Sequence, residues 1–282
     1  MELHVFGIVL VAALFHAAWN AFVKIDGDRT LFMAVLMTAS GIAALCATPF
    51  LPLPRLEVWP YIALSVLLHV GYSTCLIFAY RYGDLSHVYP LARGSAPLIV
   101  AMASVMVFDE VLSQAAWFAV LLMACGIMSL SFTRKEQNLK DPKAVLFALV
   151  TGIFIANYTL TDAAGARLAG NAHSYAAWML GLEWIPFAAF VLWQRRTRVV
   201  QQARSVWRLA VPMGLLSLAA YWAVIWAMTV APASLVAALR ESSIVFALLF
   251  GVLFLNERLS LVRLAATFTT IFGAALLKFS RP

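Results

Sequence analysis

The feature that most constrains this chain is a succession of apolar runs, each about 20 residues long, separated by short polar connections. A helix that crosses a bilayer needs about 20 mostly apolar residues, because each residue advances it by only about 1.5 Å through a hydrocarbon layer about 30 Å thick. Ten such runs occupy most of the 282 residues and leave no room for a separate soluble domain. The sequence therefore predicts an all-α polytopic membrane protein with about ten transmembrane helices. The predicted spans are 4–23, 31–51, 58–80, 86–108, 113–132, 144–162, 172–193, 209–229, 233–254 and 259–279.

The composition excludes the soluble alternatives. Hydrophobic residues make up 63% of the chain and charged residues 12%, against about 45–50% and about 25% in an ordinary soluble domain. Too few charges remain to cover a water-facing surface, so a cytosolic enzyme, a nucleic-acid binder and a disordered chain are excluded. The three cysteines lie inside apolar runs and predict neither a metal site nor a disulfide framework. We interpret the first run as a retained span, because no positive segment precedes it and it contains no small-residue cleavage site.

The chain also repeats itself. A shift of 147 positions carries residues 88–132 onto 235–279 without a gap. Three of the matches are not explained by apolar composition: Arg93 with Arg240, Glu110 with Glu257, and Gly126 with Gly273. Because five spans per unit is an odd number, the second unit must enter the membrane from the opposite side. The prediction is an inverted repeat of residues 1–132 and 144–282, joined by a basic linker at 133–143, with a site near the midplane between the two units.

Three features point to a family. They are the ten short spans, the Glu-x-Leu-Ser turns that begin at Glu110 and Glu257, and the Trp19-Asn20 pair in the first span. Together they resemble the drug/metabolite transporter superfamily, in particular its EamA-type members, over essentially the whole chain. The resemblance implies two EamA-like five-helix repeats and a carrier for small organic solutes, but no particular substrate. The segment from His16 to Asn20 also resembles a subgroup associated with phosphonate use.

The loop charges predict an orientation. Fourteen of the basic residues that flank the spans fall on one side of the membrane and four on the other. Short basic loops stay in the cytoplasm. We therefore expect both termini on the non-cytoplasmic side, although many members of the superfamily are described with cytosolic termini.

Two arginines lie inside predicted spans at matching depths. Arg93 and Arg240 each follow about seven residues of their span, which places them roughly 10 Å deep. A charge near the bilayer centre costs at least about 2.5–3.5 kcal/mol, so it usually faces a cavity or a partner. A guanidinium binds carboxylate or phosphate oxygens bidentately, and we predict that both arginines hold an acidic group of the substrate. The alternative is that each neutralises a nearby acid, Glu241 or Glu183, or bonds to carbonyls that a broken helix leaves free.

Two acids and two further polar groups accompany the arginines. Glu241 follows Arg240 directly, so on a continuous helix their side chains point about 100° apart, and we predict that Glu241 contributes to binding. Glu183, His16 and His69 are candidates for carrying a coupled proton, because buried carboxyl and imidazole groups are the usual proton carriers in membrane proteins. Each has a structural alternative: the glutamates can bind a substrate amine or balance an arginine, and the histidines can hydrogen-bond to a neighbour.

Aromatic and amide side chains complete the predicted site. Trp19 and Asn20 share a face of the first span with His16, and Tyr158 occupies a comparable place in the sixth span. Tyr72 and Trp222 lie well inside their own spans. We predict that these side chains line the cavity, the alternative being interhelical hydrogen bonding worth only about 0.6 kcal/mol per bond.

Motifs of enzymes are missing from the sequence, including zinc-hydrolase, nucleophile-elbow and phosphate-loop patterns. We therefore predict no catalytic residue, cofactor or metal. Without an ATP-binding module, transport is passive or driven by a gradient. The predicted function is a secondary carrier of the inner membrane for a small organic anion or zwitterion, such as an amino acid or aminophosphonate. Its partners are the solute and the lipid bilayer, without nucleic acid, and the oligomeric state stays open. The alternatives are an exporter of hydrophobic or cationic compounds and a lipid-linked flippase.

Overall fold

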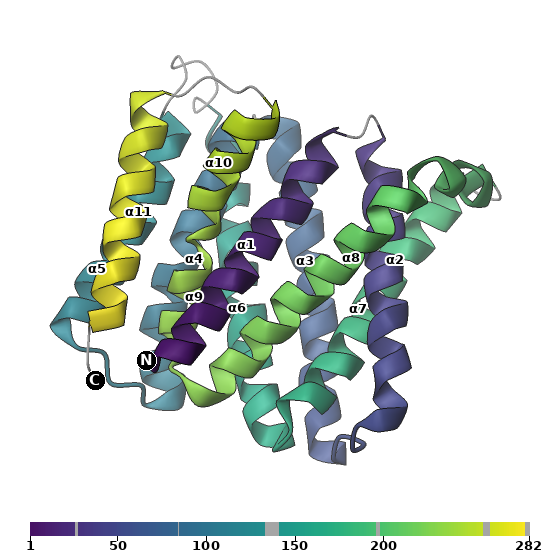
Figure 1. Ribbon diagram of the computed structural model, residues 1–282, viewed down its shortest axis with the longest axis horizontal. Coiled ribbons are helices and arrows are strands. Elements are labelled where there is room, and N and C mark those ends of the chain that lie inside the picture. Colours follow the sequence, from purple (N-terminus) through teal and green to yellow (C-terminus); the bar gives the residue numbers. More distant parts are fainter. Residues whose placement is uncertain (26–27, 84, 133–140, 196–197, 256–259, 280–282) are drawn as a thin grey trace.

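The computed structural model describes residues 1–25, 28–83, 85–132, 141–195, 198–255 and 260–279, and within these ranges helices and the connections between them make up the whole chain, without strands (Figure 1). Fourteen helical elements follow one another along the described chain. They are α1 (Leu3–Ile25), α2 (Arg29–Ala47), η1 (Thr48–Phe50), η2 (Leu56–Val58), α3 (Trp59–Tyr82), α4 (Leu85–Phe108), α5 (Gln114–Ser129), η3 (Leu130–Phe132), α6 (Pro142–Ala169), α7 (Ala172–Arg195), α8 (Arg198–Val230), α9 (Ala233–Arg240), α10 (Ser243–Leu255) and α11 (Leu261–Phe279).

Most of these helices can cross a membrane. Nine segments of the described chain are long and apolar enough, with α9 and α10 counted together as one span. The remaining crossing corresponds to α5, which has 16 residues and is apolar but shorter. The prediction of an all-α polytopic membrane protein is therefore confirmed.

The two ends of the bundle are distinguished by where the chain enters and leaves. In Figure 1, α1 begins and α11 stops at the same lower end, which we call the terminal end. At the opposite, upper end η3 stops and α6 begins, and we call it the linker end. We refer to α1–α5 with η3 as the first half and to α6–α11 as the second half. Because α1 starts at the terminal end and α6 at the linker end, corresponding helices of the two halves run in opposite directions.

The helix contacts come in related pairs. α3 packs along α6 as α8 packs along α1, and α4 lies on α6 as α10 and α9 lie on α1. α2 pairs with α7, and α5 with α11, so that the members of each pair come from different halves. Exchanging the first helix of one half with the first helix of the other, and so on in order, carries these contacts onto one another, whereas the α2–α8 contact is more extensive than its counterpart between α3 and α7.

Matched glycines let α5 and α11 approach closely. A Cβ built on Gly126 of α5 would lie 2.2 Å from Oγ1 of Thr269 in α11. A Cβ on Gly273 of α11 would lie 2.4 Å from Cγ of Met123 in α5. Small residues at helix interfaces are how membrane helices gain close van der Waals contact. The glycine match found in the sequence therefore corresponds to a reciprocal helix contact.

Three helix boundaries differ from the predicted spans. α6 continues to Ala169 instead of ending at 162, because the residues after Asp162 are helix-favouring and the acid itself is buried. α8 begins at Arg198, so part of the stretch predicted as a polar connection is helical. The predicted span 233–254 is divided between α9 and α10 by a turn at Glu241 and Ser242.

Candidate functional site

The centre of the bundle holds an ion pair between the two halves. Arg93 of α4 directs its guanidinium at Glu241, with Nε 3.0 Å from Oε2 and Nη2 2.9 Å from Oε1. Two parallel N–H···O bonds of this kind are the bidentate geometry that a guanidinium forms with a carboxylate. Both residues are buried. The pair therefore ties α4 of the first half to the α9–α10 turn of the second.

The break between α9 and α10 shapes this pair. The N–H groups of Glu241 and Ser242 bond to the carbonyls of Ala238 and Leu239, each three residues back and 3.0 Å away. These tighter bonds end α9 at Arg240 and let α10 start at Ser243. The expected separation of Arg240 and Glu241 on one continuous helix is not found, because their Nε and Oε1 atoms lie 3.9 Å apart.

Arg240 supplies a second buried cation. Its Nε has no hydrogen-bond partner among the described residues, and its guanidinium carbon lies 5.9 Å from the centre of the Tyr221 ring. Two arginines and one glutamate leave a formal excess of one positive charge at this point. A buried donor without an acceptor costs about 1–3 kcal/mol. The arrangement therefore suits an additional anionic group with acceptor oxygens.

Further polar atoms without a partner lie around Arg240. They include Oγ of Ser242 and Nε2 of His16, judged against the part of the chain that the structure describes. His16 lies close enough to Arg93 and Arg240 to interact electrostatically with both. Trp19, whose Nε1 also lacks an acceptor there, packs edge-on against His16 with ring centres 5.1 Å apart. This side of the centre thus gathers several buried polar atoms that lack a hydrogen-bond partner among the described residues.

Aromatic rings around His69 and Tyr158 form a further wall of the centre. The imidazole of His69 stacks on Tyr158 with ring centres 4.0 Å apart, and Tyr72 meets the same ring edge-on at 5.9 Å. Tyr221 lies edge-on to both Tyr158 and His69, at 6.3 and 6.0 Å. Tyr221 therefore lies near both Arg240 and His69.

An acidic group lies behind this wall. Nε2 of His69 is 3.8 Å from Oε1 of Glu183. Nδ1 of His69 is 2.9 Å from the Ser65 carbonyl, which can only accept a hydrogen bond, so Nδ1 carries a proton and Nε2 faces the carboxylate. The site is consequently polarised, with positive charge toward α4 and α9 and negative charge toward α7.

Asp162 is a member of this acidic side that the sequence analysis missed. It is completely buried in α6 and accepts hydrogen bonds from the hydroxyls of Tyr175 at 2.8 Å and Tyr221 at 2.6 Å. The apolar pattern predicts Asp162 at the end of the span 144–162. Its spacing of four residues from Tyr158 places both on one helix face, and that is the signal that could have found it.

The remaining predicted residues lie elsewhere or are occupied locally. The Asn20 amide donates to the His16 carbonyl of its own helix at 2.7 Å. The Trp222 indole donates to Nδ1 of His173 at 2.8 Å, in an exposed contact away from the ion pair. The structure thus brings together nine of the predicted side chains, to which it adds Tyr221 and Asp162, and it leaves Asn20 and Trp222 outside this set. The nine are Arg93, Arg240, Glu241, Trp19, Tyr72, Tyr158, His16, His69 and Glu183.

Comparison with known proteins identifies the architecture. The model of the EamA-like transporter family matches residues 142–279. The chain belongs to the drug/metabolite transporter superfamily. A search of curated proteins gave no match. A solved structure described only as "Crystal structure of protein" superposes with a TM-score of 0.77, covering 99% of this chain and 98% of its own at 18% identity, which shows the shared fold.

As a member of this superfamily, the protein is a membrane transporter of the drug/metabolite kind.

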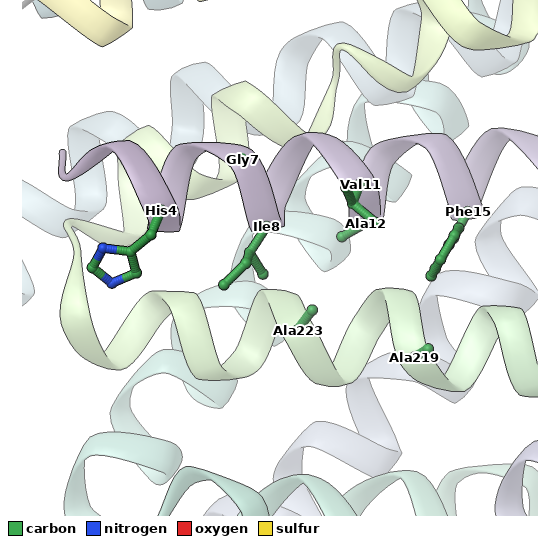
Figure 2. A pocket seen from close by; sticks show the side chains of 8 residues that line it. All are labelled: His4, Gly7, Ile8, Val11, Ala12, Phe15, Ala219 and Ala223. Atoms are coloured by element: carbon green, nitrogen blue, oxygen red, sulfur yellow. The ribbon is translucent and has the colours of Figure 1, made fainter.

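The polar centre is separate from the groove shown in Figure 2, which runs between α1 and α8 and has a volume of about 310 Å³. That groove is almost entirely apolar and is lined by His4, Gly7, Ile8, Val11, Ala12, Phe15, Ala219 and Ala223. None of the ion-pair residues lines it. The groups that can recognise a charged solute are those of the polar centre.

Proposed function

We propose that this transporter carries a small organic anion or zwitterion, of the amino-acid or aminophosphonate type, across the inner membrane by alternating access. The observation that supports this proposal most strongly is the buried guanidinium of Arg240. It lies beside an ion pair that is already complete, and its Nε has no acceptor among the described residues. A carboxylate or phosphonate supplies both the missing charge and the missing acceptor oxygens.

The polarity of the centre favours a particular pose. The acidic group of the solute binds Arg240 and the neighbouring donors of Ser242 and His16. A substrate amine then points across Tyr158 toward Glu183. Because Glu183 is in contact with His69, this carboxylate can take either the amine or a proton, and Glu183, His69 and His16 are the proposed carriers of a coupled proton.

The arrangement of the two halves supports alternating access. Arg93 belongs to the first half, whereas Arg240 and Glu241 belong to the second, so a solute at the centre contacts both. We propose that residues 1–132 and 144–282 act as two inverted units that rock about this point.

The loop charges support an orientation in which both termini face away from the cytoplasm. In that orientation a reporter that is active only in the cytoplasm gives no signal when it is fused at Pro282.

Ligand-induced thermal stabilisation of the detergent-purified protein tests the substrate class. A ligand that binds only the folded form raises the melting temperature by mass action. We expect stabilisation by amino acids or aminophosphonates, weaker effects from carboxylates or phosphonates that lack an amine, and none from simple amines. Arg240→Gln removes the shift, and proteoliposomes that contain this variant lose uptake.

Arg208→Gln is the matched control, because Arg208 is an exposed arginine of α8 far from the ion pair. It should retain both the thermal shift and uptake. If Arg93→Ala and Arg240→Ala both leave uptake and its dependence on anions unchanged, the proposed substrate class is wrong.

A second candidate function rests on the acidic side of the centre. Glu183 and Asp162 lie next to a wall of tyrosines, which is an arrangement that also suits a hydrophobic cation. In that case the protein exports cationic metabolites or drugs, and the arginines only hold the helices together. Competition of transport by organic cations, with no effect of anions, favours this alternative over the first proposal.

A further inference from the structure

A second junction between the halves lies at the terminal end. α4 ends at Phe108, and Asp109 adopts a left-handed conformation with φ of 51°. The Glu110 N–H then bonds back to the Ser104 carbonyl, six residues earlier, at 3.4 Å. This turn sends the Glu110 side chain out of the first half toward α9.

Glu110 supplies the cap that α9 lacks. The residue before α9 is Pro232, whose side chain makes no capping hydrogen bond. Glu110 accepts instead from the N–H groups of Ala233 at 2.6 Å and Ser234 at 3.3 Å, and from the Ser234 hydroxyl at 2.7 Å. A carboxylate at a helix N-terminus satisfies free N–H groups and interacts favourably with the helix dipole. α9 is thus capped by the other half of the molecule.

Arg167 closes the junction. Its Nη2 is 3.1 Å from Oε1 of Glu110 and also reaches the Ala231 carbonyl at 3.3 Å. Its Nε donates to the Met228 carbonyl at 2.9 Å, and its guanidinium carbon lies 4.6 Å from the centre of the Phe108 ring. Arg167 therefore connects the ends of α4, α6 and α8 around the Glu110 carboxylate.

α9 links this junction to the centre. It has eight residues, all of them buried, and at about 1.5 Å per residue it spans roughly 12 Å. Its first turn is held by Glu110, and its last residue is Arg240, next to the Arg93–Glu241 pair. Both ends of α9 are therefore anchored by residues of the first half.

We propose that Glu110 is a positioning residue for the binding site: by capping α9 from the first half it holds Arg240 at the centre, and its release from α9 opens the terminal end. This inference rests on the proposed function, because it assigns Arg240 to solute binding. A solute that binds Arg240 can displace the C-terminal end of α9, which is a short helix. The contacts of Glu110 at the N-terminal end of α9 are those that close the terminal end of the bundle.

Two measurements on Glu110→Gln test the proposal. The amide keeps one acceptor but loses the charge, so solute affinity falls, and KM rises about ten-fold or more because a charge-assisted hydrogen-bond set is worth several times RT. For the second measurement Ser242→Cys is introduced after Cys46, Cys75 and Cys125 have been replaced. A membrane-impermeant thiol reagent then reports how far the centre is open to each side of sealed vesicles.

We expect slow labelling of this cysteine from the terminal side in the parent protein and at least several-fold faster labelling in Glu110→Gln. Glu110→Asp, which keeps the charge on a shorter side chain, restores part of both properties. Ser234→Ala removes one donor to Glu110 and shifts both in the same direction as Glu110→Gln, so a failure of Glu110→Gln to fold leaves the proposal testable. Glu57→Gln, which changes an exposed acid at the same end, is the matched control.

Unchanged KM and unchanged labelling in folded Glu110→Gln would overturn the proposal. Thiol labelling requires no substrate, so its result does not depend on which solute the protein carries. If Arg240→Gln keeps the ligand-induced thermal shift while Glu110→Gln still speeds thiol labelling, only the proposed substrate class is contradicted. If Arg240→Gln removes the ligand-induced thermal shift while Glu110→Gln leaves thiol labelling unchanged, only the proposed role of Glu110 is contradicted.

Discussion

The two ends of the bundle are each closed by an ion pair between the halves, but the two pairs are built differently. At the terminal end, the side chains of Glu110 and Arg167 are 7% and 30% exposed. At the linker end, Arg195 of α7 pairs with Asp28, with Nη2 2.9 Å from Oδ1 and a second contact between Nη1 and Oδ2, and the two side chains are 25% and 40% exposed. The carboxylate at the terminal end is therefore the better shielded.

The two acids also differ in which helix they cap. Asp28 accepts from the Leu31 N–H at 3.1 Å and so caps α2, the helix that it precedes. Glu110 caps α9, which belongs to the other half. Separation of the halves at the linker end leaves the cap of α2 in place, whereas separation at the terminal end uncaps α9. We therefore expect the linker end to open at the lower cost in free energy.

The largest effect expected from this comparison is on stability. Removing one partner of a buried ion pair costs about 3–5 kcal/mol, whereas an exposed pair contributes about 0–1 kcal/mol and a helix cap about 1 kcal/mol. Glu110→Ala should therefore lower the free energy of unfolding by about 3 kcal/mol, at the lower end of that range because Arg167 is partly exposed, and Asp28→Ala by about 1–2 kcal/mol. Denaturant unfolding in detergent measures both, and equal losses would show that the two ends are equivalent.

A smaller effect is expected from acid. Burial by itself raises the pKa of Glu110, but hydrogen bonds from Ser234, from the Ala233 N–H and from Arg167 outweigh it and hold the pKa below the ordinary value of 4.5. A lowered pKa in the folded state means that the stabilisation is complete above the ordinary value and is lost as the pH falls through the lowered one. As the pH falls below 4.5, the melting temperature of the parent protein should thus decrease relative to that of Glu110→Gln. A constant difference between the two proteins from pH 7 to pH 3 would contradict this.

The pKa of Asp28 is also held below its usual range, first by its hydrogen bonds with Arg195. Because Asp28 is the more exposed acid, the same comparison with Asp28→Asn should give a smaller change.

The smallest effect expected is that of salt. Charges that are exposed to water are screened over about 10 Å at 0.1 M ionic strength and about 3 Å at 1 M, whereas buried pairs are screened much less. Raising the salt concentration to about 1 M should increase thiol labelling of the Ser242→Cys probe from the linker side while labelling from the terminal side changes little. An equal increase from both sides would remove the distinction between the two ends.

Part of the central site was accessible from the sequence. Arg93 and Arg240 are costly inside a membrane and occupy matching positions of a repeat, so their register alone marked them as candidates. Asp162 was missed because an acid followed by small residues has the pattern of a span boundary. Its burial depends on hydroxyl donors of Tyr175 and Tyr221, which lie on two other helices.

Glu110 illustrates a different limit. Its Glu-x-Leu-Ser turn was visible, and Ser113 of that turn caps α5 by accepting from the Ala116 N–H, as a local pattern suggests. The role of the glutamate depends on a helix that begins more than a hundred residues later. The matching Glu257 lies outside the described residues. No pattern within the turn indicates that Pro232 leaves α9 without a cap of its own.

The sequence by itself determined that this is an all-α membrane protein with about ten crossings, because a bilayer accepts only apolar segments of a fixed length. Tertiary structure alone decided which buried charges meet. Arg93 pairs with Glu241 across 148 positions, and the break after Arg240 brings a second cation to the same carboxylate. Such contacts depend on the packing and rotation of whole helices, which the spacing of apolar residues along one helix does not specify.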